Sequence, residues 1–243
     1  MIDIHCHILP ALDDGAGNMS DAVEMAELAV ASGIKGIIAT PHCNVSGSFR
    51  NFWSLEAESK LNRFKDELRK QNIPLNIYAG QEIYLAPGFI ELLRERKLVT
   101  LNNSRYLLVE FAVDEHANIA YRKLQQIISE GYAPVVAHPE RYGFVREFDD
   151  AIYRMKDLGA LLQVSRCSLN GKFGSRVQLA AMDIVESFQA DFVASDAHSP
   201  YKRTPRLADI HEYIAEHFSQ EYADVLMKIN PEKILFNEKI YAY

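Results

Sequence analysis

Short runs of hydrophobic residues alternate along the chain with longer segments in which hydrophobic residues recur every three or four positions. The short runs are typical of strands, and the longer segments are typical of amphipathic helices. Runs such as Gly-Ile-Ile-Ala and Pro-Val-Val-Ala contain no polar residue, which is typical of parallel strands that are covered on both faces. The pattern predicts strands over residues 2–6, 35–40, 75–80, 106–111, 134–138, 161–164 and 191–195.

A helical pattern follows each predicted strand. The pattern predicts helices over residues 20–32, 54–71, 88–96, 117–130, 148–158 and 175–189, and a helical segment after residue 195. Seven strand-then-helix units close most simply into an α/β barrel, here a TIM-like (β/α)7 barrel. An open doubly wound sheet is the alternative, although no Gly-x-Gly-x-x-Gly motif of a dinucleotide site follows any strand.

Length, charge and cysteine usage narrow the class of protein. A single barrel domain would use the whole chain, residues 1–243. The net charge of −7 and the lack of a long basic run argue against nucleic-acid binding. The sequence has no hydrophobic stretch near the roughly 20 residues of a membrane span, and no pattern of a signal peptide. Cys6, Cys43 and Cys167 are far apart and odd in number, so we expect reduced thiols in a cytoplasmic protein.

Side chains that bind metals follow six of the seven predicted strands. In a parallel barrel the carboxyl ends of all strands meet at one edge, where the active site lies. Only the strand at 161–164, which runs into Gln163-Val164-Ser165, offers no obvious ligand. The candidate metal ligands at the other strand ends are His5, His7, Asp14, His42, Glu82, Glu110, His138, Asp196 and His198.

The first and fourth strands carry the clearest signals. Residues two apart in a strand project to the same face, so we expect His5 and His7 to point together and Cys6 to point away. A single His-x-His is more commonly a pair of core or surface histidines. Glu110, however, lies inside an otherwise hydrophobic run. Burial of an unpaired carboxylate is costly, and a metal ion would offset that cost.

The chemistry of these residues indicates which ions they suit. Imidazoles and carboxylates without a thiolate suit Mn²⁺, Fe or Zn²⁺ in a catalytic site. Nine candidate ligands are too many for one ion, so we expect two or three ions with Glu82 as a bridge. The four carboxylates carry a charge of about −4, and three divalent ions would reverse the sign of the pocket so that it attracts phosphate.

The motifs His-x-His, Asp-Asp-Gly, Thr-Pro-His, Gly-Gln-Glu-Ile, His-Pro-Glu-Arg and Ser-Asp-Ala-His occur in this order along the chain. Together they resemble the polymerase-and-histidinol-phosphatase (PHP) superfamily, and more narrowly the bacterial metal-dependent protein-tyrosine phosphatases of capsule and exopolysaccharide biosynthesis. The resemblance extends from residue 1 to about residue 206. It implies a distorted seven-stranded barrel and a manganese-type trinuclear centre. It also implies a substrate, phosphotyrosine on the cytoplasmic tail of a membrane-associated tyrosine autokinase.

The resemblance also implies how the ligands are divided among three ions. One ion would be held by His5, His7, Glu82 and Asp196. The second would be held by Glu82, Glu110 and His138, and the third by Asp14, His42 and His198.

The resemblance further implies a phosphate clamp. Arg141 matches the arginine that grips phosphate in this family, and a second arginine follows the last histidine. Arg203 is favoured for that position over Arg206. The resemblance leads to a hypothesis for the mechanism, in which a hydroxide held between ions attacks phosphorus while the arginines hold the phosphate oxygens. A ligating histidine, such as His42 or His198, or a metal-held water would protonate the leaving phenolate.

Several alternatives remain open at the level of sequence. A cysteine-dependent tyrosine phosphatase requires Cys-x5-Arg, but the sixth residues after the three cysteines are Leu12, Phe49 and Phe173. Another phosphomonoesterase on the same centre, such as a histidinol-phosphate phosphatase, is the nearest alternative. A PHP-type nuclease and a metal-binding scaffold without catalysis are more distant ones. Residues 241–243 are expected to form an exposed aromatic tail rather than a kinase target.

Overall fold

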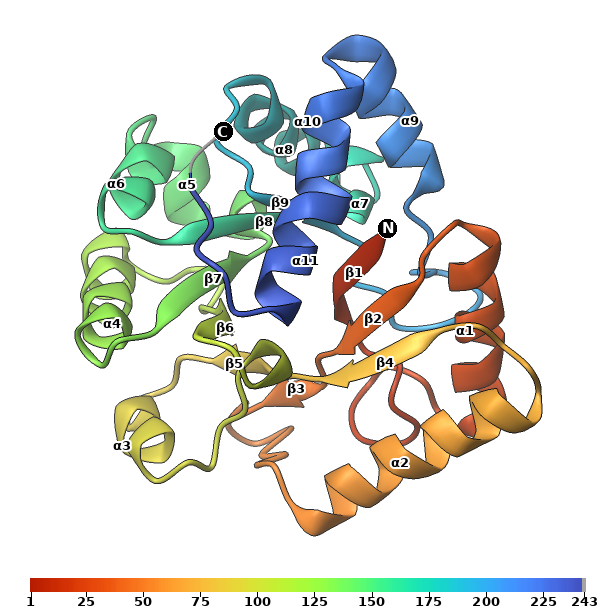
Figure 1. Cartoon of the computed structure of the whole chain (residues 1–243). Coiled ribbons are helices and arrows are strands. Elements are labelled where there is room, and N and C mark those ends of the chain that lie inside the picture. The colour runs from red at the N-terminus through yellow and green to blue at the C-terminus, as the bar shows by residue number, and fades with distance from the viewer. Residues whose placement is uncertain (242–243) are drawn as a thin grey trace.

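The computed structural model describes residues 1–241, in which parallel strands and helices alternate along the chain (Figure 1). The strands are β1 Ile2–Cys6, β2 Gly36–Ala39, β3 His42–Cys43, β4 Asn76–Ala79, β5 Glu82–Tyr84, β6 Tyr106–Glu110, β7 Ala133–Ala137, β8 Leu161–Ser165 and β9 Phe192–Ala194. The helices are α1 Met19–Ala31, α2 Leu55–Lys70, α3 Phe89–Arg94, α4 Ala117–Ser129, α5 Gly143–Glu147, α6 Ala151–Asp157, α7 Arg166–Leu169, α8 Ser175–Glu186, α9 Ala208–His217, α10 Gln220–Asp224 and α11 Asn230–Leu235. Single turns are η1 Leu101–Asn103, η2 Pro139–Arg141 and the π-helical η3 Val225–Ile229.

Two short strands lie beyond the ranges predicted from the sequence. The strand expected over 35–40 is β2, and β3 follows it after a break at Thr40 and Pro41; the strand expected over 75–80 is β4, and β5 follows it after a break at Gly80 and Gln81. Proline has no backbone N–H to donate to a ladder, which explains the first break. At the second break the chains approach closely, since a Cβ on Gly80 would lie 2.7 Å from Ile38 Cγ2.

The strands follow one another around a ring in chain order. A three-stranded sheet has the order β1-β2-β4, and a six-stranded sheet has the order β3-β5-β6-β7-β8-β9, with parallel pairing in both. A parallel bridge between Cys6 and Ala197 joins the last strand to the first. A doubly wound sheet would reverse its strand order near the middle. The order therefore confirms the barrel-like architecture, distorted because its hydrogen-bond ladder is divided between two sheets.

Two hydrophobic layers hold this ring together. Inside it, Ile4, Ile38, Val135 and Phe192 belong to one buried cluster. Ile234 of α11 joins the same cluster, and α11 crosses the end of the ring that faces the viewer in Figure 1. The helices around the ring pack on its outside through a larger cluster. Since α11 covers the amino-terminal ends of the strands, the carboxyl ends remain available for the site.

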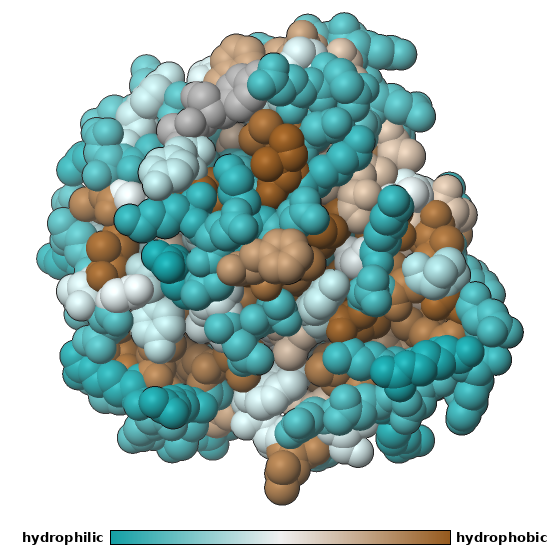
Figure 2. Space-filling model, viewed as in Figure 1, coloured by the Kyte–Doolittle hydropathy of each residue, from teal (hydrophilic) through white to brown (hydrophobic). Residues whose placement is uncertain are grey.

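The observed helices differ from the prediction mainly after β7. A single helix was expected over residues 148–158, whereas the structure has α5 and α6 with Phe148 in extended conformation between them. The short helix α7 directly after β8 was not expected, because its four residues are too few to show a helical period. The outer surface is mostly hydrophilic on the face shown in Figure 2, with smaller hydrophobic areas among the hydrophilic ones.

Three smaller expectations concern cysteines, membranes and the C-terminus. All three cysteines are free and buried. Within residues 1–241, no helix is both long enough and hydrophobic enough to cross a membrane. Tyr241 is 73% exposed, whereas the other two residues of the expected aromatic tail, 242 and 243, lie outside the described residues.

Candidate metal centre

The nine candidate ligands gather at the carboxyl ends of the strands. They come from segments up to 193 positions apart, from His5 to His198. Each has a side-chain nitrogen or oxygen within 4 Å of such an atom of another member. The fold therefore brings together the residues that were expected to meet because they follow the ends of parallel strands.

The first pair is His5 and His7. A β-bulge between Asp3 and Cys6 changes the register of β1, and both imidazoles turn to the same side with 3.2 Å between their Nε2 atoms. Cys6 points the other way, into the outer hydrophobic cluster. These orientations are the ones that the alternation along a strand predicts.

Hydrogen bonds on the far side of each ring orient the two imidazoles. His5 Nδ1 lies 2.7 Å from Gln163 Oε1, and His7 Nδ1 lies 2.7 Å from Asp13 Oδ2. Both partners are acceptors, since the Gln163 amide nitrogen donates to a backbone carbonyl at 2.9 Å. Each Nδ1 therefore carries the proton, and each Nε2 faces the cluster. Outer hydrogen bonds of this kind are typical of metal-ligating histidines.

Glu82 lies at the centre of the cluster and is fully buried. Its Oε2 atom is 3.2 Å from Nε2 of His5 and of His7 and 3.0 Å from Nδ1 of His42. Its Oε1 atom is 2.9 Å from His138 Nε2. Oε2 nevertheless has no hydrogen bond of good geometry within the described chain. Because a buried carboxylate oxygen rarely lacks such partners, this atom fits a metal-bridging role.

The remaining ligands complete two sides of the cluster. Glu110 lies 3.3 Å from His42 Nδ1 and 3.9 Å from His138 Nε2. Asp14 Oδ1 lies 3.5 Å from His42 Nε2 and 3.6 Å from His198 Nε2. The Asp14 side chain is 57% exposed, so the cluster opens to solvent on this side.

Three groups of atoms are compact enough to hold an ion, each with its donor atoms within 4.8 Å of one another. The groups are His7, Asp14, His42 and His198; His5, His7 and Asp196; and His42, Glu82 and Glu110. They overlap with the division implied by the family resemblance but are not identical to it. His42 accompanies Glu82 and Glu110 here, and His138 reaches the cluster through Glu82.

Two arginines converge on Asp196. The Nη2 atoms of Arg141 and Arg203 each donate to the Asp196 carboxylate, and Arg203 Nε donates to the Asp196 backbone oxygen at 3.1 Å. Arg141 Nη2 also lies 3.2 Å from Ser165 Oγ. Arg206 is exposed, and its side chain has no contact with the cluster among the described residues. The geometry thus places Arg203, rather than Arg206, beside Arg141.

The carboxylates, imidazoles and arginines of the cluster shift one another's pKa values. Burial opposes the charge on Asp196, but Arg141, His5 and Arg203 hold the pKa of its carboxyl well below the usual range. Burial likewise opposes a charged His42, but Glu82 and Glu110 raise its pKa to about 12. The pKa of His198 falls to about 2, chiefly because of burial and the neighbouring His7. Carboxylates that stay ionised while buried attract cations, so protons and metal ions compete for the same nitrogens.

The comparison with protein families agrees with this geometry. A model of the family described as "Capsular polysaccharide synthesis, CpsB/CapC" matches residues 1–236. The chain belongs to the CpsB/CapC family.

Relatives of this CpsB/CapC chain are named as tyrosine phosphatases. "Tyrosine-protein phosphatase YwqE" of Bacillus subtilis is 39% identical over 243 residues, which are 99% of this chain and 94% of the relative. "Tyrosine-protein phosphatase CpsB" of Streptococcus agalactiae is 29% identical over 99% of this chain and 100% of the relative. The crystal structures of YwqE from Bacillus subtilis and CpsB from Streptococcus pneumoniae, described as unique metal-dependent tyrosine phosphatases, include a chain that matches with a TM-score of 0.92 at 37% identity. The match covers 100% of this chain and 97% of that chain. These likenesses confirm the predicted superfamily and fold.

A layer of residues behind the candidate ligands of this CpsB/CapC chain was not predicted from the sequence. Gln163 and Asp13 orient His5 and His7, and buried Asp3 accepts hydrogen bonds from Ser195 and from the His5 backbone N–H. A signal for Gln163 was present, because it is the polar residue within the hydrophobic run Leu-Leu-Gln-Val. A signal for Asp13 was present as well, because it belongs to the motif Asp-Asp-Gly, in which only Asp14 was taken as a candidate ligand.

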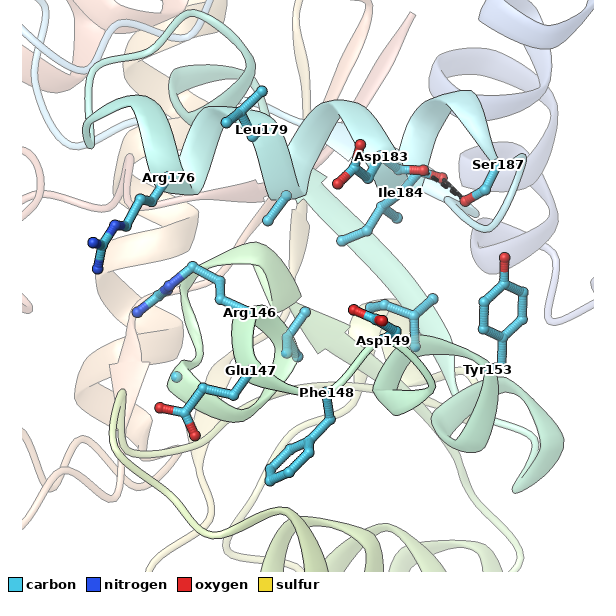
Figure 3. Close-up of a pocket in the computed structure, with 14 residues that line it drawn as sticks. Arg146, Glu147, Phe148, Asp149, Tyr153, Arg176, Leu179, Asp183, Ile184 and Ser187 are labelled. Carbon is cyan, nitrogen blue, oxygen red and sulfur yellow. Dashed lines mark hydrogen bonds between the residues drawn. The ribbon is translucent and has the colours of Figure 1, made fainter.

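A separate pocket of about 670 Å³ lies away from the cluster, between α5, α6 and α8 (Figure 3). Arg146 and Arg176 lie at one end of it, and Asp149 and Asp183 lie on its two sides. None of the nine candidate ligands lines this pocket. Two arginines and three carboxylates line it, with no histidine, so it does not share the chemistry of the cluster.

Proposed function

We propose that this chain is a metal-dependent protein-tyrosine phosphatase that acts in the cytoplasm on a phosphorylated tyrosine autokinase of capsule or exopolysaccharide synthesis. The names of its relatives support the phosphotyrosine substrate. The observation that carries the proposal is the convergence of two arginines and nine metal-type ligands on one buried carboxylate cluster.

The donor set fits divalent ions. Two imidazole Nε2 atoms and an unpartnered carboxylate oxygen face one another at 3.2 Å, an arrangement that a shared cation would stabilise. We infer two or three ions, held by His5, His7, Asp14, His42, Glu82, Glu110, His138, Asp196 and His198. Mn²⁺ is our preferred metal, and the same ligands also suit Fe or Zn²⁺. Bound ions of this kind lower the pKa of water from 15.7 to about 7 and neutralise charge on phosphate.

The chain's own residues bind and orient the substrate. Arg141 and Arg203 present their guanidinium groups at the edge of the cluster, where they would hold two phosphate oxygens by charge-assisted hydrogen bonds. The leaving phenolate has a pKa of about 10, so it needs less help from an acid than an alkoxide does. His42 and His198 flank the exposed Asp14. His42, whose pKa is raised, is our candidate for delivering that proton, whereas His198, whose pKa is lowered, is better suited to hold an ion.

Hydrolysis of a phosphotyrosine peptide, compared with histidinol phosphate, tests this function. We expect the protein with Mn²⁺ to hydrolyse the peptide at the higher kcat/KM, and we expect excess chelator to abolish the activity until the metal is restored. Metal content is measured on the same samples. Faster hydrolysis of histidinol phosphate would establish the small-molecule alternative. If the protein hydrolysed no aryl phosphate, it would be a metal-binding scaffold without catalytic activity.

A further inference from the structure

An aromatic ring lies against both arginines of the proposed phosphate clamp. The guanidinium carbon of Arg141 is 4.0 Å from the centre of the Phe173 ring, and that of Arg203 is 5.7 Å from it. Both distances are within the range of cation–π attraction. Phe173 is 37% exposed, so the ring lies at the rim of the site rather than in the hydrophobic core.

The loop that carries this ring is held in place by its own backbone. Phe173 lies between α7 and α8, flanked by Gly171 at φ +72° and Gly174 at φ +91°, values that favour glycine. The Lys172 N–H donates to Cys167 O at 3.0 Å. The loop is therefore a closed turn with a defined position for the aromatic side chain.

A second contact joins this turn to the segment that carries Arg203. Lys172 Nζ donates to the backbone oxygen of Lys202 at 3.0 Å. Arg203 directly follows Lys202 in the chain, and Phe173 directly follows Lys172. The tie between the two segments therefore fixes the ring and the guanidinium group relative to each other.

Electrostatics explains what the ring contributes. Two guanidinium groups that share one carboxylate repel each other, and Asp196 offsets that repulsion only while its oxygens face them. Asp196 is also a proposed metal ligand, which would draw its charge toward the ions. The negative face of an aromatic ring attracts both cations independently of Asp196.

We propose that Phe173 is a positioning residue that holds the guanidinium groups of Arg141 and Arg203 where they bind the phosphate group of the substrate. This inference rests on the proposed phosphatase function only for the identity of the ligand. The alternative use of the ring, stacking on the aromatic ring of the substrate, is an outcome of the test below.

The experiment measures binding rather than turnover. Calorimetry on the full chain with Mn²⁺ gives the Kd of inorganic phosphate, which has no ring, and of phenylphosphonate, which has one. We expect Phe173→Leu to weaken both ligands alike, by about fivefold, as the loss of a cation–π contact predicts. Phe173→Trp keeps an aromatic face, so its Kd values should stay within about twofold of wild type.

Controls separate positioning from folding. Phe148→Leu removes another exposed aromatic ring, 52% exposed on the pocket of Figure 3, and should change neither Kd. Thermal midpoints of all variants should match that of the wild type. An effect of Phe173→Leu on phenylphosphonate alone would show stacking on the substrate and overturn the proposal. An unchanged Kd for both ligands would overturn it too.

A double-mutant cycle tests whether Phe173 acts through arginine. In the Arg141→Ala background, the effect of Phe173→Leu on phosphate binding should fall from about fivefold to below about twofold. A full effect in that background would contradict the proposal. Because phosphate binding is measured directly, this result stands apart from catalysis. A protein that shows the expected binding pattern but hydrolyses no phosphotyrosine would refute the proposed function and leave the role of Phe173 intact.

Discussion

Three imidazoles of the cluster are held by a hydrogen bond at the Nδ1 atom. Gln163 holds His5, Asp13 holds His7, and the backbone oxygen of Asp196 holds the Nδ1 atom of His198 at 3.1 Å. At the scale of single residues, the site therefore depends on partners that touch no substrate. These partners decide which nitrogen faces inward, and hence whether the histidine is able to bind a metal.

Replacement of Gln163 by leucine should weaken metal binding. The leucine has a similar volume but no acceptor, so His5 loses the partner that orients its ring. We expect the Kd for Mn²⁺ to rise about 10- to 100-fold, the usual effect of removing such a partner. Gln189→Leu, a partly buried glutamine far from the cluster, is the matched control. Equal metal affinity in the two variants would contradict this role for Gln163.

Arg203 and Arg206 form a natural pair for testing the phosphate clamp, because they lie three residues apart and only Arg203 reaches Asp196. Arg203→Ala should reduce kcat/KM on a phosphotyrosine peptide by about 100-fold, as expected for the loss of one charged donor to the transition state. Arg206→Ala should stay within about twofold of wild type. A larger loss of kcat/KM in Arg206→Ala than in Arg203→Ala would show that Arg206 is the second arginine of the phosphate clamp.

At the scale of elements, the junction between β9 and β1 places four of the nine candidate ligands, His5, His7, Asp196 and His198. The backbone N–H of Asp196 donates to His5 O, and that of His7 donates to Ala197 O, both at 2.9 Å. Two candidate ligands that follow strands, His138 and Asp196, have left-handed backbones with φ of +36° and +51°. Such a conformation is uncommon outside glycine and turns each side chain back toward the mouth of the barrel. The strand predicted over 134–138 accordingly ends at Ala137.

Asp3→Ala should destabilise this junction. Asp3 is buried and accepts hydrogen bonds from the Ser195 N–H at 3.1 Å and the His5 N–H at 3.3 Å, as well as from Ser195 Oγ. The substitution leaves these donors without an acceptor, so we expect the free energy of unfolding in urea to fall by roughly 2 kcal/mol or more. Asp66→Ala on the surface of α2 should change it by less than about 0.5 kcal/mol. Similar values for the two variants would show that Asp3 does not stabilise the junction.

At the scale of the whole molecule, the cluster joins strands from the first to the last of the ring. His5 follows Ile4 at one end of the chain, and His198 lies beyond β9 near the other. Ions bound there would cross-link segments that are otherwise joined by the bridge between Cys6 and Ala197 and by the inner hydrophobic layer. Metal binding and folding should therefore be coupled.

Mn²⁺ should raise the thermal midpoint of the protein, and a chelator should lower it. An ion at 100 times its Kd adds about 2.7 kcal/mol to stability, or roughly 5–10 °C for a domain of this size. Glu82→Gln removes the central charge, so its midpoint should respond little to Mn²⁺. A wild-type midpoint that does not change between metal and chelator would contradict a metal centre that spans the barrel.

The sequence alone determined the alternation of strands and helices, because each element carries its own hydrophobic period. It also determined which nine candidate ligands gather at one edge, because the carboxyl ends of parallel strands share that edge. Only the tertiary structure decided that Gln163 orients His5 across 158 positions, that Arg203 reaches the site while Arg206 does not, and that Phe173 lies against both arginines. These contacts depend on the register of strands, on left-handed turns and on loops tied to one another. Local sequence does not encode such features, because each of them is settled by partners that are distant along the chain.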